Sequence, residues 1–213
     1  MEINAESIKE KLAMPGLSFD ELSHIYRLDG EEIPSVSAVM DPLRQAYYGD
    51  INQRTLERAA DKGSSVHNSI ENWIKFEIDD IPAEHRPYFD GFLEWWDLRS
   101  PQVIDSEIRM YHKLSRYGGT CDLLCRINGR IVLIDYKTTW SLSEMLCRVQ
   151  LEAYEQALAS HGIMVDEKRI LHLKRDGKWK DPVFESRDAV AWRTFGSLKS
   201  VYDYIQSYNK NRR

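Results

Sequence analysis

The stretch Ile131-Val132-Leu133-Ile134-Asp135-Tyr136-Lys137 decides how this chain folds, because four apolar residues run directly into an acid and a base. A short β-branched run of this kind predicts a buried strand. Successive side chains of a strand point to opposite faces, so Asp135 and Lys137 project from one face where the apolar run ends. A carboxylate and an ammonium are costly at the edge of a core unless they are paired or used. The stretch therefore predicts a polar site at the end of a central strand.

The residues before this strand predict a second strand that faces it. Asn128-Gly129 is a strong signal for a two-residue type I′ hairpin turn, which places Ile127 opposite Arg130. Counting back along both strands puts Asp122 opposite Asp135, with Cβ atoms about 5 Å apart. Two facing carboxylates repel, so one pKa must rise unless a cation lies between them. Oxygen ligands favour Mg²⁺ or Mn²⁺, and a one-residue slip in register would undo the pairing.

Composition indicates an ordinary soluble globular protein, with 42% hydrophobic and 30% charged residues. The length of 213 residues suits one domain, which we divide into a mainly helical part (1–100), a sheet core carrying the motifs (101–186) and a C-terminal helix (187–213). The net charge of −5 argues against a generally basic nucleic-acid coat but leaves room for local basic patches.

Cysteine usage and the N-terminal sequence bear on the compartment. Cys121, Cys125 and Cys147 fit neither a disulfide framework nor a four-ligand zinc pattern, which indicates reduced thiols. The first residues have neither the basic nor the apolar region of a secretory signal. No apolar stretch approaches membrane-spanning length. We therefore expect a soluble cytoplasmic protein with no membrane partner.

The hydrophobic period predicts the element order α-β-β-β-α-β, an α/β fold whose mixed sheet is flanked by helices, with helical additions in the N-terminal half. Helices are expected over 2–13, from Ser35 or Ser37 to an interruption at Asp41-Pro42, over 51–78 with a break at Lys62-Gly63, over 86–99, over 144–160 behind a Ser143 cap, and over 188–209. Strands are expected over 24–28, near Ile33, and over 103–112, 119–127, 130–137, 169–174 and 179–184.

Other polar residues are candidates for the same site, and each has an ordinary structural explanation. Gln150 and Tyr154 share a helical face, although an isolated pair at this spacing is more often core tyrosine and solvated glutamine. His67 is a metal ligand or a solvated histidine beside an apolar stripe. Glu107 is a third carboxylate or an edge charge. Asp-x-Lys alone occurs readily by chance in a chain this rich in charge.

The ordered set is more specific than any member. The chain contains His67, Glu107, Gly119-x-x-Asp122, Asp135-Tyr-Lys137-Thr and Gln150-x-x-x-Tyr154, with Lys-Gly-x-x-Val-His at 62–67 and Ile-Pro-Ser-Val-Ser at 33–37. Over roughly residues 24–175 it resembles the RecB-type nucleases of the PD-(D/E)XK superfamily, which include phage enzymes and the mitochondrial genome maintenance exonuclease. The resemblance implies a restriction-endonuclease-like αβββαβ core and places the protein in a bacterial or phage-infected cell.

The resemblance also implies roles for individual residues. Asp122, Asp135 and the backbone carbonyl of Tyr136 would hold the metal, with Glu107 as a less secure ligand. His67 as a further ligand would favour Mn²⁺ over Mg²⁺. Lys137 would orient the attacking water or offset charge in the transition state. Gln150 and Tyr154 would support the catalytic face or touch the DNA backbone, and Thr138 would bond to this network and is a candidate DNA contact.

The implied activity is that of a divalent-metal-dependent deoxyribonuclease, an exonuclease acting on DNA ends or single strands in replication, recombination or repair, with possible protein partners from those pathways. Three cysteines cannot supply the four ligands of the iron–sulfur cluster found in some relatives, and there is no phosphate-binding loop of a helicase motor. The alternatives are a structure-specific endonuclease and a non-catalytic DNA-binding module on the same fold. Arg44, Arg54, Arg58 and Lys62 are phosphate-track candidates or merely solvated helix charges. Tyr47, Tyr48, Trp73, Trp95 and Trp96 are base-stacking candidates or core residues.

Overall fold

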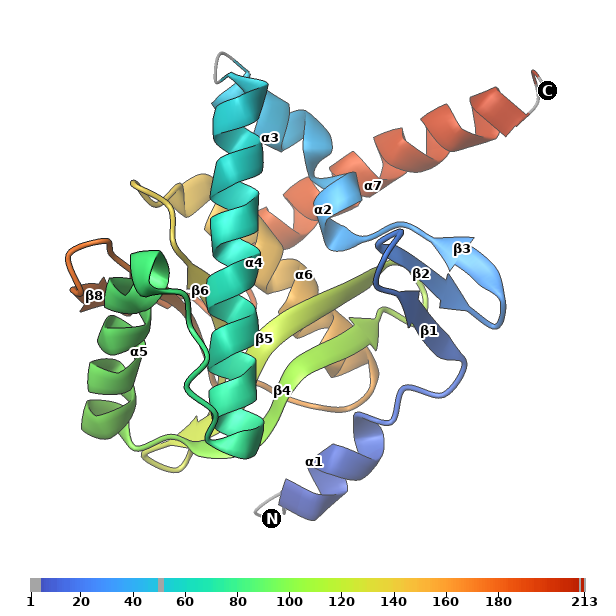
Figure 1. Cartoon of the computed structure of the whole chain (residues 1–213). Coiled ribbons are helices and arrows are strands. Elements are labelled where there is room, and N and C mark those ends of the chain that lie inside the picture. The colour runs from blue at the N-terminus through green and yellow to red at the C-terminus, as the bar shows by residue number, and fades with distance from the viewer. Residues whose placement is uncertain (1–4, 50–51, 211, 213) are drawn as a thin grey trace.

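The structure is a computed structural model that describes residues 5–49, 52–210 and 212. A mixed central sheet lies between two layers of helices, with α4 and α5 on one face and α6 and α7 on the other, and a small sheet beside it (Figure 1). The helices are α1 (Ala5–Lys11), α2 (Val36–Val39), α3 (Asp41–Tyr48), α4 (Gln53–Phe76), η1 (Ala83–His85), α5 (Arg86–Arg99), α6 (Glu144–Ser160) and α7 (Ala189–Lys210). The strands are β1 (Leu17–Asp20), β2 (Ile25–Leu28), β3 (Glu31–Ile33), β4 (Gln102–Tyr111), β5 (Gly118–Ile127), β6 (Arg130–Lys137), β7 (Glu167–Leu173), β8 (Trp179–Lys180) and β9 (Val183–Phe184).

The central sheet has the topology that the element order predicts. Strands β4, β5 and β6 form an antiparallel meander, and β7 then pairs in parallel with β6 after the crossover through α6. Short strands β8 and β9 both pair with β7. The expected α/β class and the α-β-β-β-α-β order of its core are thus confirmed.

The hairpin between β5 and β6 has the register expected from its turn. Ile127 lies opposite Arg130, and the ladder runs back to Leu123 opposite Ile134. Asn128 and Gly129 both have positive φ angles, of 51° and 78°, as a type I′ turn requires. Asp122 and Asp135 come next after the last pair of this ladder.

The two faces of the sheet have separate cores. One face carries the side chains of Leu123, Ile134, Tyr136 and Leu171 against α4 and α5, where Phe89, Phe92 and Trp95 are fully buried. The other face packs against α6 and α7, with Leu133, Ile170, Leu151 and Phe195 at its centre. Because β6 is covered on both sides, Asp135 and Lys137 at its C-terminal end directly follow a buried apolar stretch.

The N-terminal region differs from the expectation in two places. The strands expected at 24–28 and near Ile33 are present as β2 and β3, but β1 completes a three-stranded sheet that was not expected. Ser35 caps α2, accepting a hydrogen bond from the amide of Ala38 at 3.0 Å. Helix α2 ends at Val39, so the interruption expected at Asp41-Pro42 is confirmed, but a further helix, α3, begins at Asp41, with Pro42 in its first turn, where its missing N–H costs nothing.

The expected break at Lys62-Gly63 is wrong, because α4 is a single 24-residue helix. A glycine in a helix interior costs only about 1 kcal/mol, which the burial of Val66 and Ile70 in the same helix readily offsets. Position 51 of this expected helix, like positions 2–4 of the first, lies outside the described residues. The helix expected at 86–99 is α5, as predicted.

The C-terminal region also shows two differences. The strand expected over 179–184 is split into β8 and β9 around Pro182, which has no N–H to donate to a ladder. The sequence of this last helix predicts an apolar side with Phe195, Val201 and Ile205, but α7 is buried only in its N-terminal half, at Ala191 and Phe195. Val201, Tyr204, Ile205 and Tyr208 are exposed on the half that extends away from the sheet (Figure 1). Among the described helices, none has the length and apolar character needed to cross a membrane.

Candidate metal centre and catalytic cleft

The candidate site lies where two helices from opposite sides meet the polar ends of β5 and β6. Helix α4 supplies His67, and α6 supplies Gln150 and Tyr154. The oxygen Oδ2 of Asp122 accepts a hydrogen bond from the backbone amide of Tyr136, which joins the middle of β5 to the C-terminal end of β6. Gly119 permits the close approach of α6, since a Cβ at that position would come within 2.7 Å of the Tyr154 ring.

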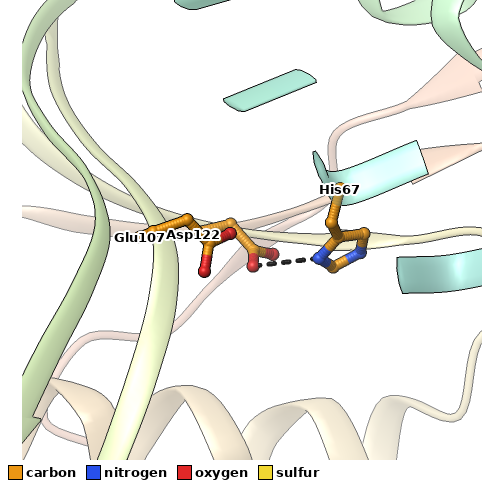
Figure 2. Close-up of side chains that lie close together, drawn as sticks. All are labelled: His67, Glu107 and Asp122. Atoms are coloured by element: carbon orange, nitrogen blue, oxygen red, sulfur yellow. Dashed lines mark hydrogen bonds and ion pairs between the residues drawn. The ribbon is translucent and has the colours of Figure 1, made fainter. Parts of the chain in front are cut away.

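Three potential ligands form a compact group. The imidazole of His67 and the carboxylates of Glu107 and Asp122 each place one ligand atom so that all three atoms lie within 4.8 Å of one another. His67 Nδ1 and Asp122 Oδ1 are 3.1 Å apart. Figure 2 shows the imidazole reaching from α4 toward the two carboxylates, which lie side by side on the adjacent strands. Glu107, the least secure of the sequence candidates, is thus a member of the group.

Glu107 reaches the group through an unusual backbone conformation. It has a φ angle of 50° in the middle of β4, between the ladder pairs Ser106–Leu123 and Ile108–Cys121. A left-handed conformation at a non-glycine residue costs about 1–3 kcal/mol and persists where the surrounding structure imposes it. Such irregularities in a strand redirect a side chain. Here the backbone conformation places the Glu107 carboxylate beside Asp122 and His67.

The charges in this group are unbalanced without a cation. Burial, followed by the charge of Asp122, raises the pKa of Glu107 to about 8. Burial alone would lower the pKa of His67, but the charge and hydrogen bond of Asp122 outweigh it and raise that pKa to about 9. Burial would raise the pKa of Asp122, yet the His67 interaction holds it below its usual value. At neutral pH the His67 imidazole and the Glu107 carboxyl therefore carry protons, and a bound metal ion would displace them.

The second predicted element, Asp135 with Lys137, lies beside the group but outside it. The ammonium of Lys137 is ion-paired with Asp135 Oδ2, and Asp135 Oδ1 accepts a hydrogen bond from Gln150 Nε2 at 3.1 Å. Gln150 also donates to the hydroxyl of Tyr154 at 2.9 Å. Burial raises the pKa of Asp135, with Lys137 acting against it and Asp122 adding to it. Of the two facing carboxyl groups, Asp135 is therefore the one whose pKa is raised.

Two cavities open on either side of these residues. One, of about 270 Å³, is lined by His67, Glu107, Asp122 and Tyr154. The other, of about 220 Å³, is lined by Lys137, Gln150, Arg44, Tyr48 and Thr139. Ser37 of α2 lines both cavities, so the ligand group and Lys137 face one cleft that α2 divides. Substrate atoms can therefore approach the site from both sides.

The predicted DNA-contacting residues fall into two classes. Arg54 and Arg58 are exposed on the first turns of α4. Lys62 instead points inward, where its ammonium donates to the carbonyl oxygen of Thr138 at 2.7 Å and to the hydroxyl of Tyr88 at 3.3 Å. The Thr138 residue is 6% exposed. Lys62 and Thr138 thus join α4 to the loop that follows Lys137, and their contact with DNA stays a prediction.

The aromatic candidates separate in the same way. Trp95 is fully buried, and Trp73 and Trp96 pack against the core between the sheet and α5. Tyr47 is exposed on α3, and Tyr48 lines the cavity beside Lys137. His172 and Lys174 of β7 and the segment after it were not predicted from the sequence, although they bond to the loop after Lys137. Bonds from a remote strand to backbone carbonyls leave no local sequence pattern.

The donor set fits a divalent metal ion. One imidazole nitrogen and two carboxylate oxygens are a mixed set that suits Mn²⁺, and Mg²⁺ through its oxygens. The separation of 3.1 Å between His67 Nδ1 and Asp122 Oδ1 is close to the roughly 3 Å between adjacent ligands in an octahedral shell of 2.1 Å radius. Burial, followed by the charge of Asp122, raises the pKa of Glu107, and a bound cation would oppose both effects. Asp135 and the Tyr136 carbonyl stay predicted ligands.

Comparisons with known proteins give likenesses of fold. Neither a protein-family model nor any curated protein sequence matches the chain. Among solved structures, that of SSO0001 is 14% identical over 92% of this chain and 83% of its own, with a TM-score of 0.48. An alkaline exonuclease from Laribacter hongkongensis is 10% identical over 71% of this chain and 92% of its own, with a TM-score of 0.41. The structure of that exonuclease in complex with dAMP is 12% identical over 85% of this chain and 95% of its own, with a TM-score of 0.36. At these scores the likenesses assign no activity to the chain.

Proposed function

We propose that the protein is a divalent-metal-dependent deoxyribonuclease. The observation that carries the proposal is the juxtaposition of the His67–Glu107–Asp122 ligand group with the Asp135–Lys137 pair in one divided cleft. A metal held next to an ammonium is the combination that phosphodiester hydrolysis needs, since the reaction develops negative charge on phosphate oxygens. The resemblance of the ordered motifs to RecB-type nucleases supports the same assignment.

The residues have distinct roles in this proposal. His67, Glu107 and Asp122 would hold the ion, with Asp135, now ion-paired with Lys137, as a further ligand. A bound divalent ion lowers the pKa of its water ligand and offsets charge on the phosphate. Burial lowers and Asp135 more strongly raises the pKa of Lys137, so its ammonium stays charged and can orient the attacking water or offset negative charge on the phosphate oxygens. Gln150 keeps Asp135 in position through the bond to its Oδ1.

The finer assignment is an exonuclease acting on DNA ends or single strands. The two cavities are small, about 270 and 220 Å³, and α2 lies between them, which favours one strand over an intact duplex. A structure-specific endonuclease is the alternative within the same chemistry. A DNA-binding module without catalysis is disfavoured because it has no need for clustered, mutually repelling carboxylates.

The test is a cleavage assay on end-labelled DNA. Linear single strands and duplexes labelled at the 5′ or 3′ end are incubated with Mn²⁺ or Mg²⁺, beside covalently closed circles and an RNA strand of the same sequence. We expect linear DNA to be degraded, circles to persist, and Lys137→Ala to be inactive. Equal activity of the wild type and Lys137→Ala, or no cleavage with any metal, would refute the nuclease assignment. Cleavage of circles would replace exonuclease with endonuclease.

A further inference from the structure

The loop between β6 and α6 has an unusual combination of rigidity and exposure. It begins directly after Lys137 and carries Trp140, whose side chain is 92% exposed. The chain has six tryptophans, all of them described, and Trp140 is the one that the structure leaves exposed. In Figure 1 the loop projects from the end of β6 beside the first half of α4. An indole is among the most apolar of side chains, so solvent is a costly environment for it.

Side-chain donors hold three consecutive carbonyls of this loop. Lys62 donates to the carbonyl of Thr138 at 2.7 Å, His172 Nε2 bonds to that of Thr139 at 2.7 Å, and Lys174 donates to that of Trp140 at 2.8 Å. The hydroxyl of Thr139 adds a bond to the carbonyl of Ser141 at 2.9 Å. The loop is therefore fixed from both α4 and the β7 side, and it presents Trp140 to solvent in a set position.

The cations that hold the loop are not neutralised by acids. Within the described part of the chain, neither Lys62 nor Lys174 has a carboxylate partner. Lys180 stands opposite His172 in the pairing of β8 with β7, and all three lysines act together to lower the pKa of His172, after the effect of its burial. The protein as a whole carries a net charge of −5, so this local excess of positive charge is distinctive. Such a patch favours a polyanion.

We propose that Trp140 is a base-stacking residue for a single-stranded DNA segment that leaves the cleft beside Lys137. The loop residues Thr139 and Leu142 on either side of it line the cavity next to Lys137, so the loop that carries the indole forms part of the wall of that cavity. An unpaired base stacks on the indole while the lysines around the loop neutralise the adjoining phosphates. This proposal rests on the proposed function, because it names how the same cleft takes its substrate.

Binding without cleavage tests the proposal. We would measure the fluorescence anisotropy of a labelled oligo(dT) strand of about 16 nucleotides in EDTA over a range of NaCl concentrations, beside a blunt hairpin duplex. Trp140→Ala should weaken oligo(dT) binding by about 5-fold to 100-fold at every salt concentration, and Trp140→Phe by less. The matched control is Leu114→Ala, at another loop residue that is 90% exposed, and it should bind as the wild type does.

Salt dependence separates stacking from charge. Trp140→Ala should leave the slope of log K against log [NaCl] unchanged, whereas Lys180→Gln should make it shallower by about 0.7. Oligo(dT) should also quench tryptophan fluorescence in the wild type and much less in Trp140→Phe. Thermal unfolding of each variant checks that the loop substitution leaves the fold intact.

Two outcomes would overturn the stacking role. The first is wild-type protein that does not bind oligo(dT) at all, and the second is Trp140→Ala that binds it as tightly as the wild type. Both readings are independent of cleavage, since no divalent ion is present. An inactive protein that still loses oligo(dT) binding on Trp140→Ala would refute the nuclease and keep the stacking residue.

Discussion

Two lysine–carboxylate clusters on neighbouring strands differ in what they leave open. On β7, Lys168 is ion-paired with Glu152 and lies 2.8 Å from Glu155, and all three side chains are at most 3% exposed. The backbone amide of Arg187 donates a hydrogen bond to Glu155, and that of Asp188 donates one to Glu152, at 2.9 Å each. On β6, Lys137 and Asp135 are also largely buried, but Lys137 and the adjoining ligand group line two cavities.

The comparison shows that a buried ion pair is not in itself the mark of a site. The Lys168 cluster is closed, because each carboxylate already accepts bonds from the start of α7 or from α6, and it joins those elements to the sheet. The site formed by Lys137 and the adjoining ligand group has unused ligand atoms, and the pKa of Glu107 in that group is raised to about 8. Unused ligand capacity with access to solvent is therefore the better criterion for chemistry.

The largest expected effect separates the two clusters by activity. Asp122→Asn removes the carboxylate that binds both His67 and the Tyr136 amide, so we expect cleavage to fall by at least about 10³-fold and the thermal stabilisation by Mn²⁺ to disappear. Steady-state cleavage and thermal unfolding with and without Mn²⁺ measure both effects.

The matched control is Glu155→Gln, which alters an equally buried carboxylate in the closed cluster. It should lower stability yet retain activity per folded molecule and the stabilisation by Mn²⁺. If Asp122→Asn kept its Mn²⁺ response while Glu155→Gln lost it, the assignment of the two clusters would be reversed.

The second effect separates the clusters by stability. Lys168→Met leaves two buried carboxylates without their cation, which we expect to cost about 3–5 kcal/mol in the free energy of unfolding. Lys137→Met should cost less, because Asp135 keeps its bond from Gln150 and its pKa is already raised, so it can take up a proton. Urea unfolding in the absence of divalent ions measures both. A greater loss for Lys137→Met would mean that the Asp135 pair is mainly structural.

Local signals account for the parts of the molecule that were predictable. The turn residues Asn128-Gly129 fix the β5–β6 register, and Ser143 caps α6 as expected, accepting a hydrogen bond from the Leu146 amide. Each is determined by residues within a few positions of itself. The facing acids at the end of that hairpin follow from the same register, which is why Asp122 and Asp135 were accessible to sequence reasoning.

Long-range packing accounts for the parts that were not. The left-handed backbone at Glu107 is imposed by its place in β4, and no glycine or asparagine marks it. The sequence therefore underrated Glu107 as a member of the ligand group. The bonds from β7 to the loop after Lys137 also join residues more than 30 positions apart. Continuity of α4 through Gly63 likewise depends on what its second half buries rather than on the glycine.

A third effect concerns pH and applies to the open site only. A metal binds the neutral imidazole and the ionised carboxylate, but in the free protein His67 holds its proton below about pH 9 and Glu107 below about pH 8. Binding must therefore release protons at neutral pH, and affinity must rise with pH. Between pH 7 and pH 8 we expect the Kd for Mn²⁺ to fall by about tenfold to a hundredfold.

Isothermal titration calorimetry in buffers of different ionisation enthalpy measures this proton release directly. His67→Ala should bind Mn²⁺ more weakly and with a shallower pH dependence, since one of the two displaced protons is gone. A Kd that does not change between pH 7 and pH 8 would exclude both His67 and Glu107 from the ligand shell.

The smallest effect tests whether the tyrosine on α6 serves the site or only the fold. Tyr154→Phe removes the hydroxyl that accepts from Gln150 at 2.9 Å, which frees the amide that positions Asp135. We expect a loss of about 1 kcal/mol in unfolding free energy and a severalfold lower kcat. Tyr117→Phe is the matched control, because its hydroxyl donates at 2.8 Å to the carbonyl of Ala153, on the same helix, and it is equally buried in a core.

The two tyrosines should therefore lose similar stability and differ only in kcat. A fall in kcat for Tyr117→Phe as large as that for Tyr154→Phe would mean that activity follows the general packing of α6. An unchanged kcat for Tyr154→Phe would show that Gln150 holds Asp135 without help from the tyrosine. Because both hydroxyls bond within one turn of α6, any difference in kcat between the variants must come from the contact with Gln150 and the carboxylate beyond it.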